Sequence, residues 1–244
     1  MLFALVDGCK SGAIPQTRGK CQLCESEVFS KCGEVNVWHW AHFKDKSCDT
    51  WYEPETDWHR NWKLIFGKEN SEIVISKDGV RHFADIKTKG DVIIELQNSP
   101  IQKPIIRRRE NFYGERMLWV INGILFKKSF AIYVSSFYRE DTESFETDYY
   151  NKLHGFSGSN SRSLLGYKKN EFSFSWNWPR KSWNEVQRNI FIDFGDNSLL
   201  WIIEGMGTKH GKAKRVGKEG FVKRYGGDIS LLPSIIEKGG DLMY

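Results

Sequence analysis

The sequence has no hydrophobic run long enough to cross a membrane. A membrane-spanning helix needs about 20 consecutive apolar residues, and the apolar stretch from Met1 to Val6 is too short for the hydrophobic region of a secretory signal. The 244 residues are 40% hydrophobic and 14% aromatic, which is enough for a packed core. We therefore expect a globular, cytoplasmic protein with no membrane partner.

The sequence also lacks a strong charge of either sign and an even number of cysteines. Its net charge of +5 is too small to indicate a nucleic-acid partner, so the distribution of charge matters more. Five cysteines cannot all pair in disulfides, and four of them lie in segment 21–48 together with two histidines. This clustering favours a metal site over disulfides.

Segment 21–48 predicts a structural zinc site. The CQLC sequence can supply two thiolates from one turn, and the HWAH sequence or a further cysteine can complete a tetrahedral Zn²⁺ site. The preferred ligands are Cys21, Cys24, His39 and His42, and the alternatives use Cys48 or Cys32 in place of a histidine. Alternatively, HWAH is a turn that packs against the rest of the protein with its histidines hydrogen-bonded.

The stretch 79–100, GVRHFADIKTKGDVIIELQNSP, predicts a β-hairpin. Val80 to Lys87 and Asp91 to Gln97 are rich in β-branched and apolar residues and are separated by a short turn. Ser71 to Ser76 adds a strand in front of them. Alternate residues of a strand share a face, so Ile94 and Leu96 are expected to lie in the core.

Two carboxylates of this hairpin are the central candidates for chemistry. With a turn near Lys89 and Gly90, Asp85 falls beside or diagonal to Glu95. Two carboxylates brought together in this way need a shared cation to remain charged. The alternative is an ordinary hairpin with solvated charges on one face.

Helices are expected on both sides of these strands in the sequence. Trp51 to Phe66 predicts a helix that begins near Pro54 and carries Glu55, His59 and Lys63 at spacings of four. Taken alone, this row indicates a solvated salt-bridge ladder. Pro100 to Arg116 predicts a second helix, and Met117 to Asn122 a fourth strand that lies parallel to its neighbour.

These motifs together resemble the CoiA-like competence nuclease family of the PD-(D/E)xK superfamily. The similar pieces, in the family's order, are His39-Trp40-Ala41-His42, the Glu55/His59/Lys63 row, Ala84-Asp85-Ile86, Ile94 to Ser99, Arg109 to Tyr113 and Trp119 to Ile121. The resemblance implies an α/β fold with a restriction-endonuclease-like core of order α-β-β-β-α-β over residues 51–125. A zinc-binding module (1–50) would precede this core and a β-rich extension (126–244) would follow it.

The resemblance also implies an activity, namely Mg²⁺- or Mn²⁺-dependent hydrolysis of DNA. The metal would be held by Asp85, Glu95 and the Leu96 carbonyl, with Glu55 as a further ligand. The water and the phosphate would be positioned by Gln97, His59 and Lys63, and the DNA contacted by Arg109, Tyr113 and Ser99. Gln97 stands where the superfamily has lysine, and Lys63 could supply that charge. The superfamily also serves restriction, repair and phage defence, so the biological process stays open.

Two other functions are compatible with the same sequence. One is a zinc-containing protein that binds nucleic acid without cleaving it, and the other is a zinc protein that recruits other proteins. The basic segment from Gly205 to Gly227 could be a mobile loop on the phosphate backbone or an ordinary solvated loop. Its GMGTKHGK sequence does not match the phosphate-loop motif.

The remaining C-terminal sequence predicts further strands. Phe130 to Ser135 indicates one strand, and Ile190 to Phe194 with Ser198 to Ile203 a second hairpin. An acidic stretch from Glu140 to Asp148 is expected not to touch DNA, and the loop from Gly155 to Ser163 is a candidate boundary. The tryptophans at 176, 178 and 183 are expected in the core, with base stacking as the alternative.

Overall fold

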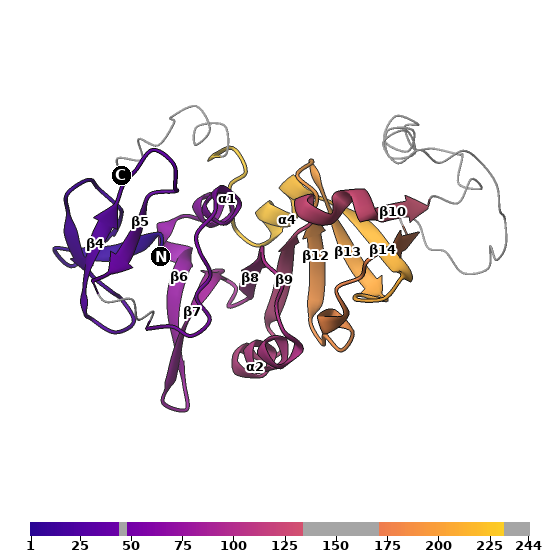
Figure 1. The fold of residues 1–244 in the computed structure, drawn as a ribbon, viewed down its shortest axis with the longest axis horizontal. Helices are drawn as coiled ribbons and strands as arrows, with labels where there is room; N and C mark the ends of the chain where they lie inside the picture. Colours follow the sequence, from indigo (N-terminus) through magenta and orange to yellow (C-terminus); the bar gives the residue numbers. More distant parts are fainter. Residues whose placement is uncertain (44–47, 134–170, 232–244) are drawn as a thin grey trace.

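The computed structural model describes residues 1–43, 48–133 and 171–231, which form a small and a large β-sheet with helices on the large one (Figure 1). The predicted acidic stretch (140–148) and boundary loop (155–163) lie outside the described residues. Within the described ranges, no helix is both long enough and apolar enough to span a membrane.

The small sheet is N-terminal and consists of short antiparallel strands in the order β2-β1-β3-β4-β5. Its strands are β1 (Phe3–Val6), β2 (Cys9–Gly12), β3 (Arg18–Lys20), β4 (Glu27–Lys31) and β5 (His39–His42). The buried residues of its core are Met1, Ala4, Ala13, Cys21, Leu23, Val28 and Trp40. So small an apolar core needs additional stabilisation.

The large sheet has nine strands in the order β10-β11-β14-β13-β12-β9-β8-β7-β6. They are β6 (Ser71–Lys77), β7 (Val80–Lys87), β8 (Ile93–Gln97), β9 (Met117–Asn122), β10 (Phe130–Tyr133), β11 (Glu171–Trp176), β12 (Asn189–Asp193), β13 (Ser198–Glu204) and β14 (His210–Gly217). The α-helices described are α1 (Asp57–Phe66), α2 (Lys103–Tyr113) and α4 (Lys218–Arg224). Short 3₁₀ helices are η1 (Lys68–Asn70), η2 (Ile124–Ser129) and η3 (Lys181–Trp183).

The mixed α/β class expected from the sequence is confirmed. Strand β9 pairs in parallel with both β8 and β12, and the other pairs in this sheet are antiparallel. The chain order α1-β6-β7-β8-α2-β9 is the α-β-β-β-α-β order that the sequence predicts, and the second hairpin is present as β12 and β13. Because β12 pairs with β9, the sheet continues from residues 51–125 into the C-terminal part.

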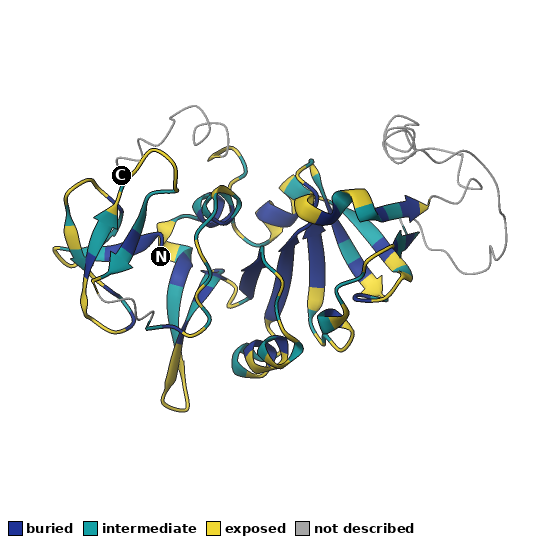
Figure 2. Ribbon diagram, in the orientation of Figure 1, coloured by how far each residue is buried: buried dark blue, intermediate teal, exposed yellow. Residues whose placement is uncertain are grey.

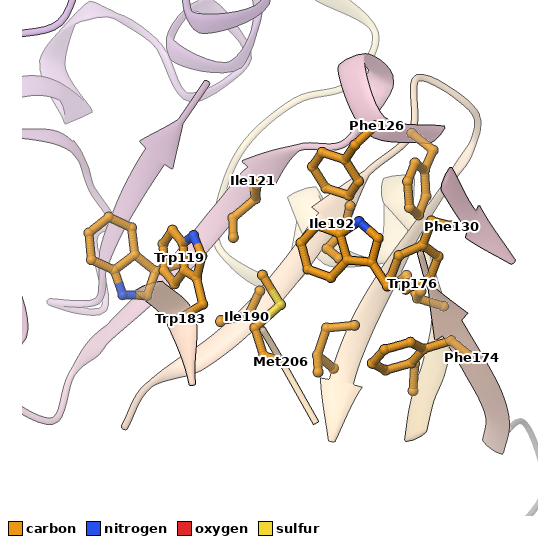
Figure 3. Packing of buried hydrophobic residues seen from close by; sticks show 14 of the residues in the cluster. Trp119, Ile121, Phe126, Phe130, Phe174, Trp176, Trp183, Ile190, Ile192 and Met206 are labelled. Carbon is orange, nitrogen blue, oxygen red and sulfur yellow. The ribbon is translucent and has the colours of Figure 1, made fainter. Parts of the chain in front are cut away.

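The centre of the large sheet is covered on both faces. On one face, Trp119 and Ile121 pack with Ile106 of α2 in a cluster rich in aromatic residues (Figure 3). On the other face, Ile94 and Leu96 pack against α1 and α4, which confirms their predicted place in the core. In Figure 2 the central strands are accordingly buried, whereas the tip of the β6–β7 hairpin projects into solvent.

Helix α1 begins three residues later than the sequence suggests, because a side chain other than Pro54 fixes its start. Thr56 has extended backbone angles (φ −119°, ψ 163°), and its hydroxyl accepts a hydrogen bond from the amide of His59. This is the geometry of an N-cap. Glu55 therefore precedes the helix. Its side chain does not have to lie one helical turn from that of His59.

Residues 210–224 of the basic C-terminal segment are not a loop, so the prediction of a loop is wrong for them, whereas contact with the phosphate backbone stays a prediction. Residues 210–217 form β14, and residues 218–224 form α4. Burial of Ala213 of β14 and of Phe221 and Val222 of α4 holds this segment in place. Some of its charges are also paired within the protein, such as Lys214 with Glu171 at 3.0 Å.

The three C-terminal tryptophans differ in their environment. Trp176 and Trp183 are fully buried in the aromatic cluster, as expected for core residues. The prediction that Trp178 lies in the core is wrong, because this residue is 77% exposed.

Asp193, at the end of β12, joins α1 to the C-terminal part of the chain. One of its carboxylate oxygens accepts from the indole nitrogens of Trp58 (3.0 Å) and Trp62 (2.9 Å). The other accepts from Lys218 Nζ (2.7 Å) and the amide of Gly195 (2.9 Å). The carboxylate is almost completely buried, so each of these donors depends on it.

We expect Asp193→Ala to lower the free energy of unfolding by about 3 kcal/mol, because it leaves a largely buried ammonium and two indole groups without their acceptor. Urea unfolding monitored by tryptophan fluorescence measures this loss. Replacement of the exposed Glu115 by alanine is the control and should change stability by less than about 0.5 kcal/mol. Equal stabilities of the two variants would contradict the assignment.

Candidate functional site

Three carboxylates lie in a row across strands β6, β7 and β8. Pairing of Ser71 with Ile86 and of Ile73 with Ala84 places Glu72 opposite Asp85. Pairing of Ile86 with Ile94 and of Lys87 with Ile93 places Asp85 at the level of Glu95. We call Glu72, Asp85 and Glu95 the carboxylate row.

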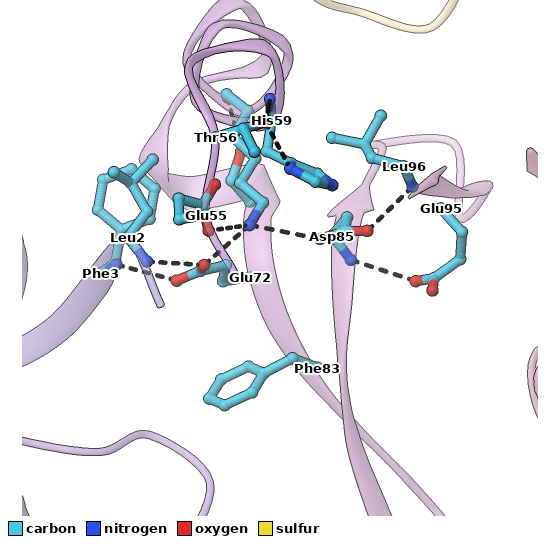
Figure 4. Close-up of polar contacts among 12 residues, drawn as sticks. Leu2, Phe3, Glu55, Thr56, His59, Glu72, Phe83, Asp85, Glu95 and Leu96 are labelled. Atoms are coloured by element: carbon cyan, nitrogen blue, oxygen red, sulfur yellow. Dashed lines mark hydrogen bonds and ion pairs between the residues drawn. The ribbon is translucent and has the colours of Figure 1, made fainter. Parts of the chain in front are cut away.

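Asp85 and Glu95 replace backbone pairing where β7 and β8 separate. The ladder between these strands is confined to two residue pairs. Beyond it, the amide of Leu96 donates to Asp85 Oδ2 at 2.9 Å, and the amide of Asp85 donates to Glu95 Oε1 at 3.3 Å (Figure 4). Each carboxylate is thus fixed by the other strand, in the proximity that the hairpin pattern predicts.

Lys63 of α1 places its ammonium among three carboxylates. Its Nζ lies 2.9 Å from Glu55 Oε2, 2.9 Å from Glu72 Oε1 and 3.3 Å from Asp85 Oδ1 (Figure 4). The Lys63 side chain is only 5% exposed. Burial lowers the pKa of Lys63, but Glu55, Glu72 and Asp85 together raise it well above its ordinary value. The predicted solvated ladder on α1 is therefore wrong, because Lys63 is a buried, charged residue of this site.

The other two residues of the predicted row, Glu55 before α1 and His59 within it, also point inward. Glu55 Oε1 is buried and has no hydrogen-bond partner, whereas Oε2 contacts Lys63. His59 is 3% exposed, and its Nδ1 lies 2.9 Å from the Thr56 hydroxyl. Burial lowers the pKa of His59, although the nearby Asp85 carboxylate opposes this shift. The imidazole is therefore more easily kept neutral than one in solvent.

Arg109 of α2 compensates the charge at the opposite end of the row. Its Nη1 donates to Glu95 Oε2 at 3.1 Å, and its Nη2 donates to the carbonyl of Trp51 at 2.6 Å. The side chain is 6% exposed and lies over the Trp51 ring. Tyr113 is one helical turn away, and its hydroxyl donates to the carbonyl of Phe83 at 2.9 Å. Both residues border the site, but the two Arg109 Nη atoms and the Tyr113 hydroxyl donate to acceptors inside the protein, and Arg109 Nε is buried without a partner.

Gln97 and Ser99 lie at the end of β8 and contact each other. Gln97 Nε2 donates to the carbonyl oxygen of Ser99 at 2.9 Å and also to a carboxylate oxygen of Glu53. Gln97 Oε1 is buried without a partner. Gln97 is thus tied to Glu53 and does not line the cavity that contains Asp85 and Glu95.

A cavity of about 60 Å³ brings most of the predicted residues together. It has room for water molecules or an ion. Its lining contains the carboxylates Asp49, Glu53, Glu55, Glu72, Asp85 and Glu95, together with His59, Lys63 and Arg109. A larger hollow of about 550 Å³, between η3 and the strands β12 and β13, contains none of the predicted site residues.

The environments of the buried carboxyl groups push their pKa values apart. Burial, followed by the charge of Asp85, raises the pKa of Glu95 to about 8, although Arg109 opposes this. Burial also raises the pKa of Glu55 despite its contact with Lys63. The pKa of Glu72 is lowered to about 2, because Lys63 and hydrogen bonds from the amides of Leu2 and Phe3 outweigh its burial. The row therefore combines one carboxylate that stays ionised, Glu72, with one carboxyl group that resists ionisation, Glu95.

Three carboxylates of this cavity, Asp49, Glu53 and Glu72, were not predicted from the sequence. Glu72 is visible only through the strand register, since its position opposite Asp85 depends on a hairpin turn at residues 78 and 79. Asp49 accepts hydrogen bonds from His82 Nδ1 (2.8 Å) and from the amide of Phe83 (2.8 Å). These contacts are distant in sequence, and no local motif indicates them.

A Cys/His cluster, which we define as Cys21, Cys24, His42 and Cys48, lies beside the small sheet. Its four ligand atoms are all within 4.8 Å of one another, and among the described residues it is the one set of three or more His, Cys, Asp or Glu side chains found in such an arrangement. The Cys21 and Cys48 sulfurs are 3.5 Å apart, and Cys24 Sγ is 3.3 Å from His42 Nε2. Ligands of tetrahedral zinc lie about 3.8 Å apart, so this cluster could bind zinc.

Hydrogen-bond donors lie close to the sulfurs of Cys21 and Cys24. The amide of Leu23 points at the Cys21 sulfur at 3.4 Å, and Glu25 closes the turn with φ 62°. Burial raises the pKa of the Cys24 thiol, but hydrogen bonds from Ser26, together with His42 and Cys48, lower it to about 6. Thiolates are the form that binds zinc.

The preferred ligand set is wrong at His39. His39 and His42 are three residues apart on β5, and residues at this spacing point to opposite faces of a strand. His39 Nδ1 instead donates to the carbonyl of Val37 at 2.8 Å. Cys48 takes its place, which is one of the alternatives that the sequence leaves open, and Cys32 is not part of the cluster.

The large mixed sheet and the Cys/His cluster define a mixed α/β protein with a candidate zinc site near its N-terminus. Residues 13–50 match the family model described as the N-terminal domain of competence protein CoiA. The matched segment contains all four residues of the cluster, and it supports a CoiA-like protein. Comparisons with curated proteins and with solved structures found no match.

Proposed function

We propose that this protein is a metal-dependent nuclease of the PD-(D/E)xK type that hydrolyses phosphodiester bonds of DNA. The observation that carries the proposal is the fixed juxtaposition of Asp85 and Glu95, each hydrogen-bonded to the backbone of the other's strand, in one cavity with Lys63. The match to the N-terminal domain of competence protein CoiA supports a competence-related role.

The carboxyl groups that line the cavity support a divalent cation as part of this proposal. Six carboxyl side chains line the cavity with two cationic ones, Lys63 and Arg109, and four of the six remain when the two whose pKa is raised by burial, Glu55 and Glu95, are set aside. A phosphodiester would be repelled by this excess of negative charge unless a further cation were present. Glu55 Oε1 is also buried there without a partner. Carboxylate oxygens are the ligands that Mg²⁺ and Mn²⁺ prefer, so Asp85 and Glu95, with Glu55, would hold the ion.

A bound divalent cation would neutralise charge at the scissile phosphate and make a bound water more acidic. The protein's own residues would orient the reaction. Lys63 uses its three N–H donors on Glu55, Glu72 and Asp85, so it would act on the phosphate through its positive charge beside Asp85 and not by a direct hydrogen bond. His59 is held by Thr56 near Asp85, where a neutral imidazole can take a proton from water. Arg109 would not contact the substrate and would orient Glu95 through their hydrogen bond.

Cleavage of labelled DNA in Mn²⁺ or Mg²⁺ tests the proposal. We expect wild type to produce shorter fragments, and Glu95→Gln to reduce the rate at least about 100-fold, because an amide cannot replace a carboxylate as a metal ligand. Glu115→Gln, on the surface, is the matched control and should cleave at the wild-type rate.

Single- and double-stranded substrates should both be used, labelled at either end, so that fragment lengths give the direction of attack. Equal cleavage by wild type and Glu95→Gln would indicate a contaminating nuclease. DNA binding that weakens with salt but produces no fragments would instead favour a non-hydrolytic nucleic-acid-binding protein.

A further inference from the structure

We propose that Glu72 is a positioning residue that directs Lys63 toward Asp85 and at the same time clamps strand β1 to the large sheet, so that the small sheet forms part of the catalytic centre. This inference rests on the proposed function for its catalytic part. Its structural part, the clamp, does not depend on that function.

The geometry gives Glu72 two sets of partners from different sheets. Its Oε1 accepts from the amide of Leu2 at 2.8 Å and from Lys63 Nζ at 2.9 Å. Its Oε2 accepts from the amide of Phe3 at 2.9 Å. One carboxylate therefore joins the first strand of the small sheet to the helix that carries Lys63.

The position of Glu72 is costly for the protein. The side chain is almost fully buried, and charges in such places are unfavourable unless they are completely paired. Its backbone has φ 49°, a left-handed conformation that is uncommon for residues with a Cβ atom. Such strain persists where the surrounding structure imposes it, and it concentrates at functional sites. An apolar side chain could fill the same space but could not orient an ammonium group.

Lys63 needs this orientation because its side chain is long and flexible. Glu55, Glu72 and Asp85 approach its ammonium as three separate acceptors, the number that an ammonium group can satisfy. Two of these acceptors, Glu55 and Glu72, lie outside the strand pair β7–β8 that carries Asp85 and Glu95. Loss of the Glu72 charge leaves only Glu55 and Asp85, and Lys63 gains freedom to leave the cavity.

The small sheet contributes a second contact at the same point. Lys10 of β2 donates from Nζ to the carbonyl of Glu72 at 3.1 Å and also to the carbonyl of Ser71. Both strands β1 and β2 thus hold residues 71 and 72 from the small-sheet side. Glu72 consequently lies where movement of the small sheet is transmitted to Lys63.

A double-mutant cycle with cleavage as its readout tests the catalytic part. Glu72→Gln preserves shape and removes charge, so we expect kcat to fall about tenfold while KM stays within about twofold. In a Lys63→Gln background, the same change should alter kcat by less than about twofold, because Glu72 acts through Lys63. Glu69→Gln, exposed and three residues away, is the control and should leave kcat unchanged.

Equal losses of kcat in the two backgrounds, or no loss in wild type, would overturn the positioning role. A general loss of stability would lower the activity of both backgrounds alike, so the cycle separates the two explanations. These comparisons use only variants whose circular dichroism matches wild type.

Amide hydrogen exchange tests the clamp without any cleavage. In Glu72→Gln we expect faster exchange at Leu2 and Phe3, with unchanged exchange in β12, which lies far along the sheet. Unchanged exchange at Leu2 and Phe3 would overturn the clamp. If wild type cleaves no DNA with either cation, the proposed function and the catalytic part both fail, and the exchange result alone decides whether Glu72 joins the two sheets.

Discussion

Removal of zinc is expected to unfold the small sheet. Structural zinc sites contribute about 10–16 kcal/mol of binding free energy, which exceeds the total stability of most domains. The small sheet has strands of three to five residues and a core in which Cys21 is itself a buried member. We therefore expect one zinc ion per chain by elemental analysis, and a loss of near-ultraviolet signal from Trp40 after chelation.

The ligand set provides the control for this prediction. His42→Ala and Cys48→Ser should lose zinc and show the same unfolding, because both belong to the Cys/His cluster. His39→Ala should keep zinc, since its ring is directed at the Val37 carbonyl. Retention of zinc by Cys48→Ser together with its loss from His39→Ala would contradict the assignment.

Replacement of Lys63 by methionine is expected to destabilise the protein by about 4 kcal/mol, because it leaves buried carboxylates without their common cation. Methionine has similar length and preserves packing, so the loss reports charge. Urea unfolding at about pH 7 measures it. Lys68→Met, at an exposed position in η1, is the matched control and should change stability by less than about 0.5 kcal/mol.

The pH dependence distinguishes lost charge pairing from lost packing. In wild type, the lowered pKa of Glu72 contributes stability that is present above its ordinary pKa of 4.5 and lost as the pH falls toward about 2. Without Lys63, burial dominates and raises the pKa of Glu55 and Glu72, so the folded state gains stability on acidification. The difference between Lys63→Met and wild type should therefore shrink between about pH 7 and pH 4. A difference that stays constant would indicate a packing defect instead.

Local patterns predict the strands around Asp85 and Glu95 well. Alternation of apolar residues and the turn after Lys87 define both strands, and helix signals define α1 and α2 to within a few residues. What these patterns cannot provide is contact between distant segments. Asp193 meets Trp58 and Trp62 only because β12 pairs with β9, and no periodicity in either segment encodes that pairing.

The errors at the site have the same origin. Lys63 has the spacing of a solvated ladder, and only its position against β6 and β7 makes it a buried residue with three carboxylates around it. The basic segment ending in α4 has the composition of a loop. Its residues 210–217 nevertheless form a strand, because they pair with β13 in the sheet. His39 differs: its exclusion follows from strand geometry alone and could have been inferred once HWAH was assigned to a strand.

The carboxylate row limits which insertions the chain can accept. Antiparallel strands joined by a turn keep their register only when both strands lengthen by the same number of residues. With the turn lengths unchanged, the separation between Glu72 and Asp85 can thus change only in steps of two, and the same holds between Asp85 and Glu95. A single residue inserted into one strand, between the turn and its carboxylate, would turn that carboxylate to the other face of the sheet. The number of residues between each carboxylate and its turn is therefore a mark by which the row can be followed through divergent sequences.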